Sequence, residues 1–210
     1  MTDLTLSASA FLFDMDGTLL ESTDAVTRVW GRFADSFGLE LDHIMATSHG
    51  VRMAETVERH APVGTDIDAV VADLSAFELA DNDGIVAVAG AAELLSALPQ
   101  ASVALVTSAS RELAVARMRA AGLPLPAVLV TAEDVEFGKP RPDCYLLAAR
   151  RLGVDARDSI VFEDADAGVR AGLAAGARVI VVGDLETEAT AGLTHIADYV
   201  GVRLVVGRGQ

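Results

Sequence analysis

Two aspartates are placed where they can take part in chemistry. Asp14 and Asp16 follow the apolar run of residues 11–13 and precede Gly17. Such a run is typical of a buried strand, and two residues of extended chain point both carboxylates to the same side. Two neighbouring anions repel each other unless a cation or a shared proton offsets the repulsion. A divalent metal ion is the natural partner of this pair.

Two other interpretations of the segment compete with a metal site. An EF-hand needs a further oxygen ligand at position five of its loop and glycine at position six, where this chain has Thr18 and Leu19. The EF-hand is therefore excluded. The second interpretation is a strand end followed by solvated turn residues, because aspartate and glycine are common in turns. The other motifs of the chain decide between this interpretation and a metal site.

Hydroxyl and acidic side chains follow two later apolar runs. Thr107 and Ser108 come after a short aliphatic segment and open a predicted helix, whose free backbone amides favour an anion. Glu163 and Asp164 follow another such segment. Each pair, taken alone, is also explained as ordinary residues at a helix start. Carboxylates that converge from two strand ends, however, favour a metal site.

Lys139 is the only lysine of the chain, whose 15 other basic residues are arginine. It lies in the proline-bracketed loop 138–142, ahead of a predicted helix. A chain that favours arginine so strongly but keeps one lysine in a stiff loop indicates a need for a compact, directed ammonium. A chance surface lysine is the alternative.

The elements that must position these residues alternate along the second part of the chain. Beyond Gly84, short aliphatic segments alternate with alanine-rich helical segments. The pattern predicts strands at residues 103–106, 127–130, 159–162 and 178–182, and helices near residues 90–98, 110–121, 142–152 and 166–175. It indicates right-handed βαβ units, and so an α/β protein with a Rossmann-like parallel sheet and helices on both faces. Ligands of such a sheet bind outside the carboxyl ends of the strands, where the motifs lie.

Residues 21–84 interrupt the alternation. Apolar residues there, among them Val29 and Phe33, recur at three- and four-residue spacings, which predicts amphipathic helices. Because only one strand is predicted before this stretch, we interpret it as a helical cap inserted after the first strand. The predicted α/β catalytic core then consists of residues 1–20 and 85–210.

The overall composition narrows the class of protein. The chain has 210 residues, of which 51% are hydrophobic, so it is long enough to bury a sizeable core. Its 16 basic and 31 acidic residues give a formal charge of −15, which repels nucleic-acid backbones and anionic membranes. A single cysteine, Cys144, excludes an internal disulfide and favours a reducing compartment. Neither a secretory signal nor an apolar run of about 18 residues is recognised, so we expect a cytoplasmic protein.

The four motifs together resemble those of the haloacid dehalogenase superfamily, in particular its magnesium-dependent phosphatases with a helical cap after the first strand. The nucleophile loop of that superfamily is similar to Asp-Met-Asp-Gly-Thr of this chain. The matching segments, in chain order, are residues 14–18, 107–108, 138–140 and 163–164. They extend over nearly the whole chain, and their order and spacing are those of the superfamily.

The resemblance implies a covalent mechanism. It implies that Asp14 attacks phosphorus to form an aspartyl-phosphate, and that Asp16 acts as general acid on the leaving oxygen and then as general base for water. It also implies Mg²⁺ held by Asp14, the backbone carbonyl of Asp16 and Asp164, with Glu163 supporting the site from outside the direct ligands. The chemistry agrees, because a carboxylate that attacks an anionic phosphoryl group needs cations, which Mg²⁺ and Lys139 supply.

The remaining candidate residues are expected to bind the substrate. Thr107 or Ser108 donates to a phosphoryl oxygen, and the sequence leaves open which of the two does so. His49 and Arg52 lie in a segment similar to the caps of phosphatases that act on small sugar and polyol phosphates, such as 2-deoxyglucose 6-phosphate or glycerol 3-phosphate. A solvated helix start is the alternative for this pair. Glu21, next to the hinge, is a further candidate for substrate contact.

Two branches of the superfamily are excluded by their chemistry. True haloacid dehalogenases lack the second aspartate, here Asp16, and phosphonoacetaldehyde hydrolases use a cap lysine, which this cap lacks. We therefore predict a Mg²⁺-dependent phosphatase of a small phosphorylated sugar or polyol. A sugar phosphomutase of the β-phosphoglucomutase type and a non-catalytic metabolite-binding relative are the alternatives. We expect no nucleic-acid or membrane partner, and a monomer or a weak homodimer.

Overall fold

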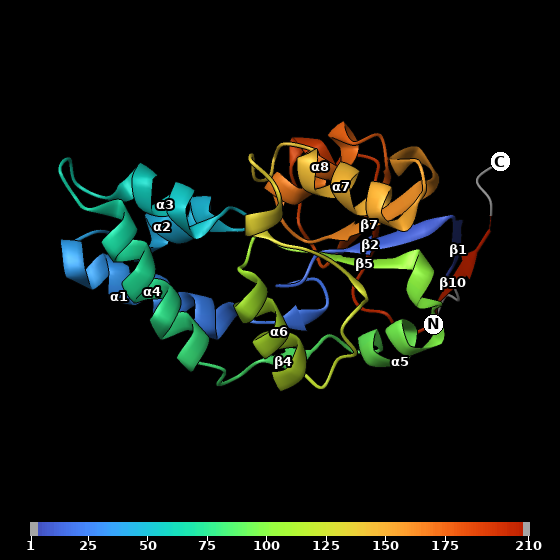
Figure 1. Cartoon of the computed structure of the whole chain (residues 1–210), viewed down its shortest axis with the longest axis horizontal. Coiled ribbons are helices and arrows are strands. Elements are labelled where there is room, and N and C mark those ends of the chain that lie inside the picture. Colours follow the sequence, from blue (N-terminus) through green and yellow to red (C-terminus); the bar gives the residue numbers. More distant parts are fainter. Residues whose placement is uncertain (1–3, 208–210) are drawn as a thin grey trace.

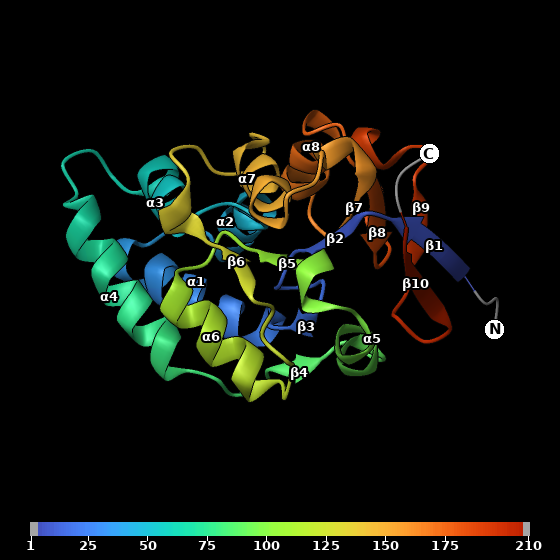
Figure 2. The same cartoon turned by 45° about the vertical axis from the view of Figure 1, so that its right-hand side comes forward.

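The computed structural model describes residues 4–207. Within this range the main sheet has six strands, all parallel. Figure 2 shows their order across the sheet, which is β6 (Val128–Val130), β5 (Val103–Val106), β2 (Ala10–Phe13), β7 (Ser159–Glu163), β8 (Arg178–Val182) and β9 (Thr194–Ile196).

Helices cover both faces of the sheet (Figure 1). One face carries α5 (Ala91–Ala97) and α6 (Arg111–Ala120), and the other carries α7 (Asp143–Leu152) and α8 (Asp166–Ala174). Strands buried on both faces are apolar at nearly every position. In β2, Phe11 and Phe13 pack in the core shared with α5 and α6, whereas Leu12 packs in the core shared with α7 and α8.

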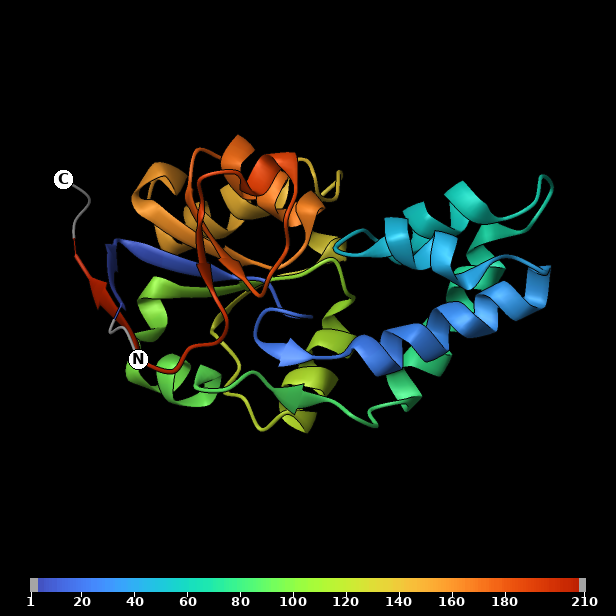
Figure 3. The same ribbon diagram turned by 180° about the vertical axis from the view of Figure 1, so that it is seen from behind.

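A separate helical unit, residues 23–80, lies beside the sheet (Figures 1 and 3). It consists of α1 (Thr23–Phe37), α2 (Leu41–Ser48), α3 (Met53–His60) and α4 (Ile67–Ala80). The unit has its own apolar core, to which Trp30, Phe33 and Leu74 contribute. The chain enters it through β3 (Leu20–Glu21) and leaves it through β4 (Val86–Ala87), and these two short strands pair antiparallel.

The predicted fold class is confirmed, because helices flank both faces of a parallel sheet and a helical segment follows its first strand. The prediction of a single strand before the helical segment is wrong, since β1 (Leu4–Ala8), β2 and β3 all precede it. β1 pairs in parallel with β10 (Val202–Val206) outside the main sheet. Both strands are partly exposed, and they lack the buried apolar run by which β2, β5, β6, β7 and β8 were predicted.

Among the described residues, no helix combines the length and the apolar character needed to cross a bilayer.

Candidate active site

The predicted motifs meet at one edge of the sheet. β5, β2 and β7 are adjacent and parallel, so the residues that follow them leave the sheet at the same edge. Thr107, Asp14 and Asp164 are placed in this way, each just beyond a strand end. Lys139 reaches the same place from the loop between β6 and α7. The carboxyl end of the sheet is thus the candidate active site, as expected for an open parallel sheet.

Lys139 is the central cation of the site. Its side chain is 1% exposed, and its Nζ donates to Asp14 Oδ1 and to Glu163 Oε1, the latter at 2.6 Å. A third donation goes to the carbonyl oxygen of Val106 at 3.3 Å. Burial by itself lowers the pKa of Lys139, but Asp14 and Glu163 raise it above its usual value. The lysine therefore stays an ammonium, in contact with both carboxylates.

Glu163 is locked in place by contacts on both of its oxygens. Oε1 accepts from Lys139 and from the Tyr145 hydroxyl, the latter at 2.8 Å, and Oε2 accepts from the backbone amides of Asp164 at 3.0 Å and Ala165 at 3.1 Å. A Cβ at Gly168 would lie 1.7 Å from Oε1, so only glycine fits there. Glu163 thus acts as a buried support that directs the Lys139 ammonium towards Asp14.

Asp164 is oriented from both sides. Thr18 Oγ1 donates to its Oδ1 at 2.8 Å, and His49 Nε2 lies 2.8 Å from its Oδ2. The contact with Asp164 raises the pKa of His49 to about 9. Gly17, which has a φ of 80°, passes so close that a Cβ there would lie 1.9 Å from Asp164 Oδ2. The glycine after the aspartate pair is therefore required by both backbone conformation and space.

Three carboxylates form a cluster that fits a divalent cation. Oxygen atoms of Asp14, Glu163 and Asp164 lie within 4.8 Å of one another. Burial raises the pKa of Asp14 well above its usual value, and the two neighbouring carboxylates add to this effect against the opposing influence of Lys139. The Lys139 ammonium and the protonated His49 imidazole carry two positive charges against three carboxylates, so the cluster keeps an excess of negative charge. Oxygen-only donors with an excess of negative charge are the ligands that hard divalent cations prefer.

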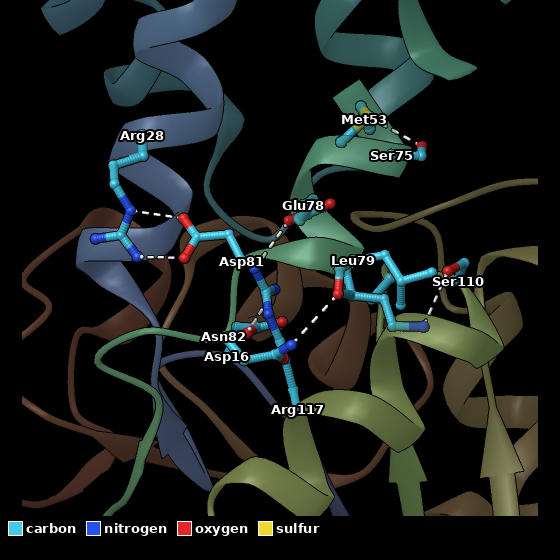
Figure 4. Close-up of polar contacts among 12 residues, drawn as sticks. Asp16, Arg28, Met53, Ser75, Glu78, Leu79, Asp81, Asn82, Ser110 and Arg117 are labelled. Carbon is cyan, nitrogen blue, oxygen red and sulfur yellow. Dashed lines mark hydrogen bonds and ion pairs between the residues drawn. The ribbon is translucent and has the colours of Figure 1, made fainter. Parts of the chain in front are cut away.

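The side chain of Asp16 points elsewhere. Its Oδ1 accepts a hydrogen bond from Arg117 Nη1 at 2.9 Å, and Arg117 belongs to α6 (Figure 4). The carboxylate is therefore separate from the cluster of Asp14, Glu163 and Asp164. For Asp16, a metal contact was expected only through its backbone carbonyl.

The two hydroxyl residues after β5 make different contacts. Thr107 Oγ1 accepts from the backbone amide of Ala109 at 3.0 Å, which leaves its hydroxyl proton for another acceptor. Ser108 Oγ instead donates to the carbonyl of Gly50, in the helical unit, at 2.8 Å. The proton of Ser108 is thus already used between the core and the helical unit.

A cleft lies between the core and the helical unit. It has a volume of about 370 Å³, and its lining includes Asp16 and Asp164 from the core together with Glu21 and His49. Glu21 and His49 therefore both line this cleft. Arg52 is directed elsewhere, because its guanidinium donates to the backbone carbonyls of residues 135 and 136, at 2.8 and 3.0 Å.

Three residues at the site were missed by sequence reasoning. Arg117 lies mid-helix among other arginines, and nothing in its segment separates it from a surface residue. The sequence likewise gives no sign that Tyr145 and Thr18 contact the site, although Thr18 lies within the first motif. A hydroxyl so close to the aspartate pair was the one available signal.

The family and its relatives agree with this geometry. A model of the haloacid dehalogenase-like hydrolase family matches residues 8–176. Hexitol phosphatase A of Escherichia coli is 46% identical over 182 residues, 84% of each chain. Glycerol-1-phosphate phosphohydrolase 2 of Saccharomyces cerevisiae is 33% identical and is matched over 84% of this chain and 75% of its own length.

A solved structure shows the same fold. CbbY from Rhodobacter sphaeroides in complex with phosphate superposes with a TM-score of 0.77 at 26% identity, over 93% of this chain and 97% of that one. The family match spans all four motifs at the sheet edge, which confirms the resemblance seen in the sequence. The chain therefore belongs to the haloacid dehalogenase-like hydrolase family.

Proposed function

We propose that this chain is a phosphatase that hydrolyses a small sugar or polyol phosphate through an aspartyl-phosphate on Asp14. The observation that carries the proposal is the buried ammonium of Lys139, bound to Asp14 beside two further carboxylates. The relatives support the substrate class, because hexitol phosphatase A and the glycerol-1-phosphate phosphohydrolase are named for polyol phosphates.

The attack on phosphorus is assigned to Asp14. A carboxylate approaches an anionic phosphoryl group only when the repulsion between them is offset, and Lys139 is already in contact with the carboxylate. We assign the contact with a phosphoryl oxygen to Thr107, because its hydroxyl proton is unused while that of Ser108 goes to Gly50. Thr107 is thus our proposed member of the pair between which the sequence left the choice open.

We propose that Mg²⁺ is the cation of this site. Asp14 and Asp164, with the backbone carbonyl of Asp16, would hold it, while Glu163 stays engaged with Lys139 and Tyr145. When bound, Mg²⁺ supplies positive charge that stabilises the phosphoryl oxygens in the transition state. For Asp164 to hold the ion, the contact between His49 Nε2 and Asp164 Oδ2 must then break, or His49 and Mg²⁺ must share this carboxylate.

Asp16 is the proposed proton carrier. Asp16 lines the cleft and its carboxylate lies outside the carboxylate cluster, which suits a group that protonates the leaving oxygen and then takes a proton from water. Asp14 and Asp16 thus have different surroundings although they are two residues apart.

The lining of the cleft favours a hydroxyl-rich, uncharged leaving group. Among its described residues, Asp16, Glu21, Asp164 and Asp184 are carboxylates, and arginine and lysine are absent. Carboxylates accept hydrogen bonds from hydroxyl groups and repel a second phosphate. Contacts of Glu21 and His49 with substrate hydroxyls are proposed on this basis. The same contact by Arg52 requires its guanidinium to leave the loop carbonyls.

The phosphomutase alternative is disfavoured by the same lining. A mutase must hold a bisphosphate, whose second phosphate needs a cationic partner, and His49 is the one candidate among the described residues of the cleft. A non-catalytic relative is disfavoured as well, since binding alone requires neither the buried Lys139 contact nor a separate proton carrier.

A substrate screen tests the proposal. Purified protein is incubated with hexitol 6-phosphates, glycerol phosphates, glucose 1-phosphate and a sugar bisphosphate, with and without Mg²⁺, and the products are identified by phosphorus NMR. We expect inorganic phosphate from polyol or sugar monophosphates in the presence of Mg²⁺. A sugar phosphate isomer without free phosphate would establish the mutase instead, and no turnover of any ester would overturn the proposal.

We further propose that residues 21–84 act as a cap over the cleft, and that the enzyme works in the cytoplasm as a monomer or a weak homodimer. Ser108, Arg52 and His49 all join the helical unit to the core at the site, which supports the cap assignment. Light scattering across a concentration series checks the oligomeric state.

A further inference from the structure

A buried arginine joins the proposed proton carrier to the helical unit. Arg117 of α6 is 2% exposed and places one nitrogen on each of two carboxylates. Nη1 donates to Asp16 Oδ1 at 2.9 Å, and Nη2 donates to Glu78 Oε1 at 2.9 Å. Glu78 lies near the end of α4, so a single guanidinium connects the core, the helical unit and Asp16 (Figure 4).

Burying the Arg117 guanidinium costs free energy of folding, whereas a solvent-exposed ion pair would not. Arg117 Nε is buried and has no hydrogen-bond partner. Burial also raises the pKa of Glu78, against the opposing effect of Arg117. Buried charged groups with an unsatisfied donor are expensive to keep, so the contact calls for an explanation beyond stability.

The neighbouring contacts hold Glu78 at a fixed position. Just beyond α4, Asp81 accepts from Arg28 of α1 at 2.6 and 3.0 Å, and the same guanidinium donates to the carbonyl of Asp83 at 2.8 Å. These contacts join α1, which follows β3, to the end of α4, which precedes β4 (Figure 4). Glu78 is therefore carried by a part of the helical unit that is braced at its connection to the core.

We infer that Arg117 is a positioning residue for Asp16 and that Glu78 holds Arg117 in the orientation this requires. The planar guanidinium fixes two carboxylates at set directions, which a flexible ammonium does less well. Because Arg117 occupies only Oδ1 of Asp16, the second oxygen is left to meet the leaving group in the cleft. The inference rests on the proposed function, in which Asp16 carries the proton.

The test compares two small esters that differ in their need for a proton. Glycerol 3-phosphate has an alkoxide leaving group that must be protonated, whereas the acetate released from acetyl phosphate leaves without a proton. The value of kcat/KM reports the steps up to phosphoryl transfer to Asp14, so the ratio of the two kcat/KM values reports how well Asp16 is placed. This ratio does not depend on the fraction of folded enzyme.

We expect Arg117→Met to lower kcat/KM for glycerol 3-phosphate by about tenfold or more relative to acetyl phosphate, part of the usual contribution of a positioned general acid. Glu78→Ala should shift the ratio in the same direction by about threefold, because Arg117 keeps its contact with Asp16 but loses its second anchor. If Arg117→Met cannot be purified in folded form, the Glu78→Ala variant carries the test by itself.

Asp73→Ala is the matched control. Asp73 lies on the same helix as Glu78 and also pairs with an arginine, Arg32, at 3.0 Å, but its side chain is 62% exposed and away from the site. Its variant should leave the ratio unchanged. An unchanged ratio in Arg117→Met or Glu78→Ala would overturn the inference, as would a ratio shifted towards glycerol 3-phosphate. Wild-type protein that hydrolyses neither these two esters nor any ester of the substrate screen would overturn the proposed function instead.

Discussion

The surroundings of Lys139 leave no room for a larger cation. We expect Lys139→Arg to be nearly as inactive as Lys139→Ala, because the planar guanidinium cannot occupy the point that the ammonium shares with Asp14 and Glu163. The loss should be about 3 kcal/mol of transition-state stabilisation, or about a hundredfold in kcat/KM. Steady-state kinetics on the preferred ester, with circular dichroism as the control for folding, measures it. A Lys139→Arg enzyme of near-normal activity would show that the lysine is incidental.

Substitution of each of the two aspartates of the first motif should impair the enzyme in a different way. Asp14→Asn removes the proposed nucleophile, so no phosphoenzyme should be found by mass spectrometry after mixing with p-nitrophenyl phosphate. Asp16→Asn should still form phosphoenzyme with this activated ester, which needs little protonation, while turnover falls for want of a base. Wild-type turnover of a polyol phosphate by both variants would contradict the roles assigned to them.

At the scale of elements, the loop that carries Lys139 is fastened at its start by Asp134. This carboxylate accepts from Arg151 of α7 at 2.6 Å, from Arg111 of α6 at 3.0 Å and from the backbone amide of Thr131 at 2.9 Å. Although partial burial raises the pKa of Asp134, its hydrogen bonds with Arg151 and Thr131 lower it to about 2. The loop between β6 and α7 is thereby held against two helices on opposite faces of the sheet.

We expect Asp134→Asn to destabilise the fold by about 1 to 2 kcal/mol at pH 7, less than the ~2.6 kcal/mol that a shift from a pKa of about 4 to about 2 corresponds to, because solvent screens the contacts. The folded-state pKa is depressed, so this stabilisation is present above pH 4 and is lost as the pH falls towards 2. Urea unfolding of both proteins at pH 7, 5, 4 and 3 should show the difference shrinking below pH 4. A difference that is constant over this range would argue against the charged contact.

At the scale of the whole molecule, the chain is acidic, and three of its carboxylates meet at the site where we propose a cation. The chain has a net charge of −15, and Asp14, Glu163 and Asp164 gather at one sheet edge. We expect EDTA to abolish ester hydrolysis and Mg²⁺ to restore it, whereas Ca²⁺ restores little because its looser coordination disturbs the in-line geometry. A Mg²⁺ concentration of about a hundred times Kd should also stabilise the fold by about 2.7 kcal/mol, seen as a higher Tm.

Asp164→Asn supplies the control for this experiment, since it keeps the shape of the side chain and removes a proposed ligand charge. Its Tm should respond much less to Mg²⁺ than that of the wild type. Full activity of the wild-type enzyme after exhaustive dialysis against EDTA would contradict the metal assignment.

The sequence by itself determined the α/β class, the helical segment after the first sheet strand and the four motifs. Strands buried on both faces are apolar throughout, and the motif residues come directly after such strands. Because parallel strands end at one edge of their sheet, Asp14 and Asp164 had to meet once the strands were recognised. Residue types and their spacing within each motif can be read from the sequence, because they do not depend on how distant segments pack.

Only the tertiary structure decided the contacts between elements that are distant along the chain. Arg117 meets Asp16 across 101 residues, and the direction of Arg52 and the contact of Ser108 with Gly50 depend on how the helical unit packs against the core. The strands at the edge of the main sheet or outside it, β1, β3, β4, β9 and β10, were likewise missed, because partly exposed strands do not require an apolar run. Helix periodicity shows which face of a helix is buried, but not which charged residue of another element meets it.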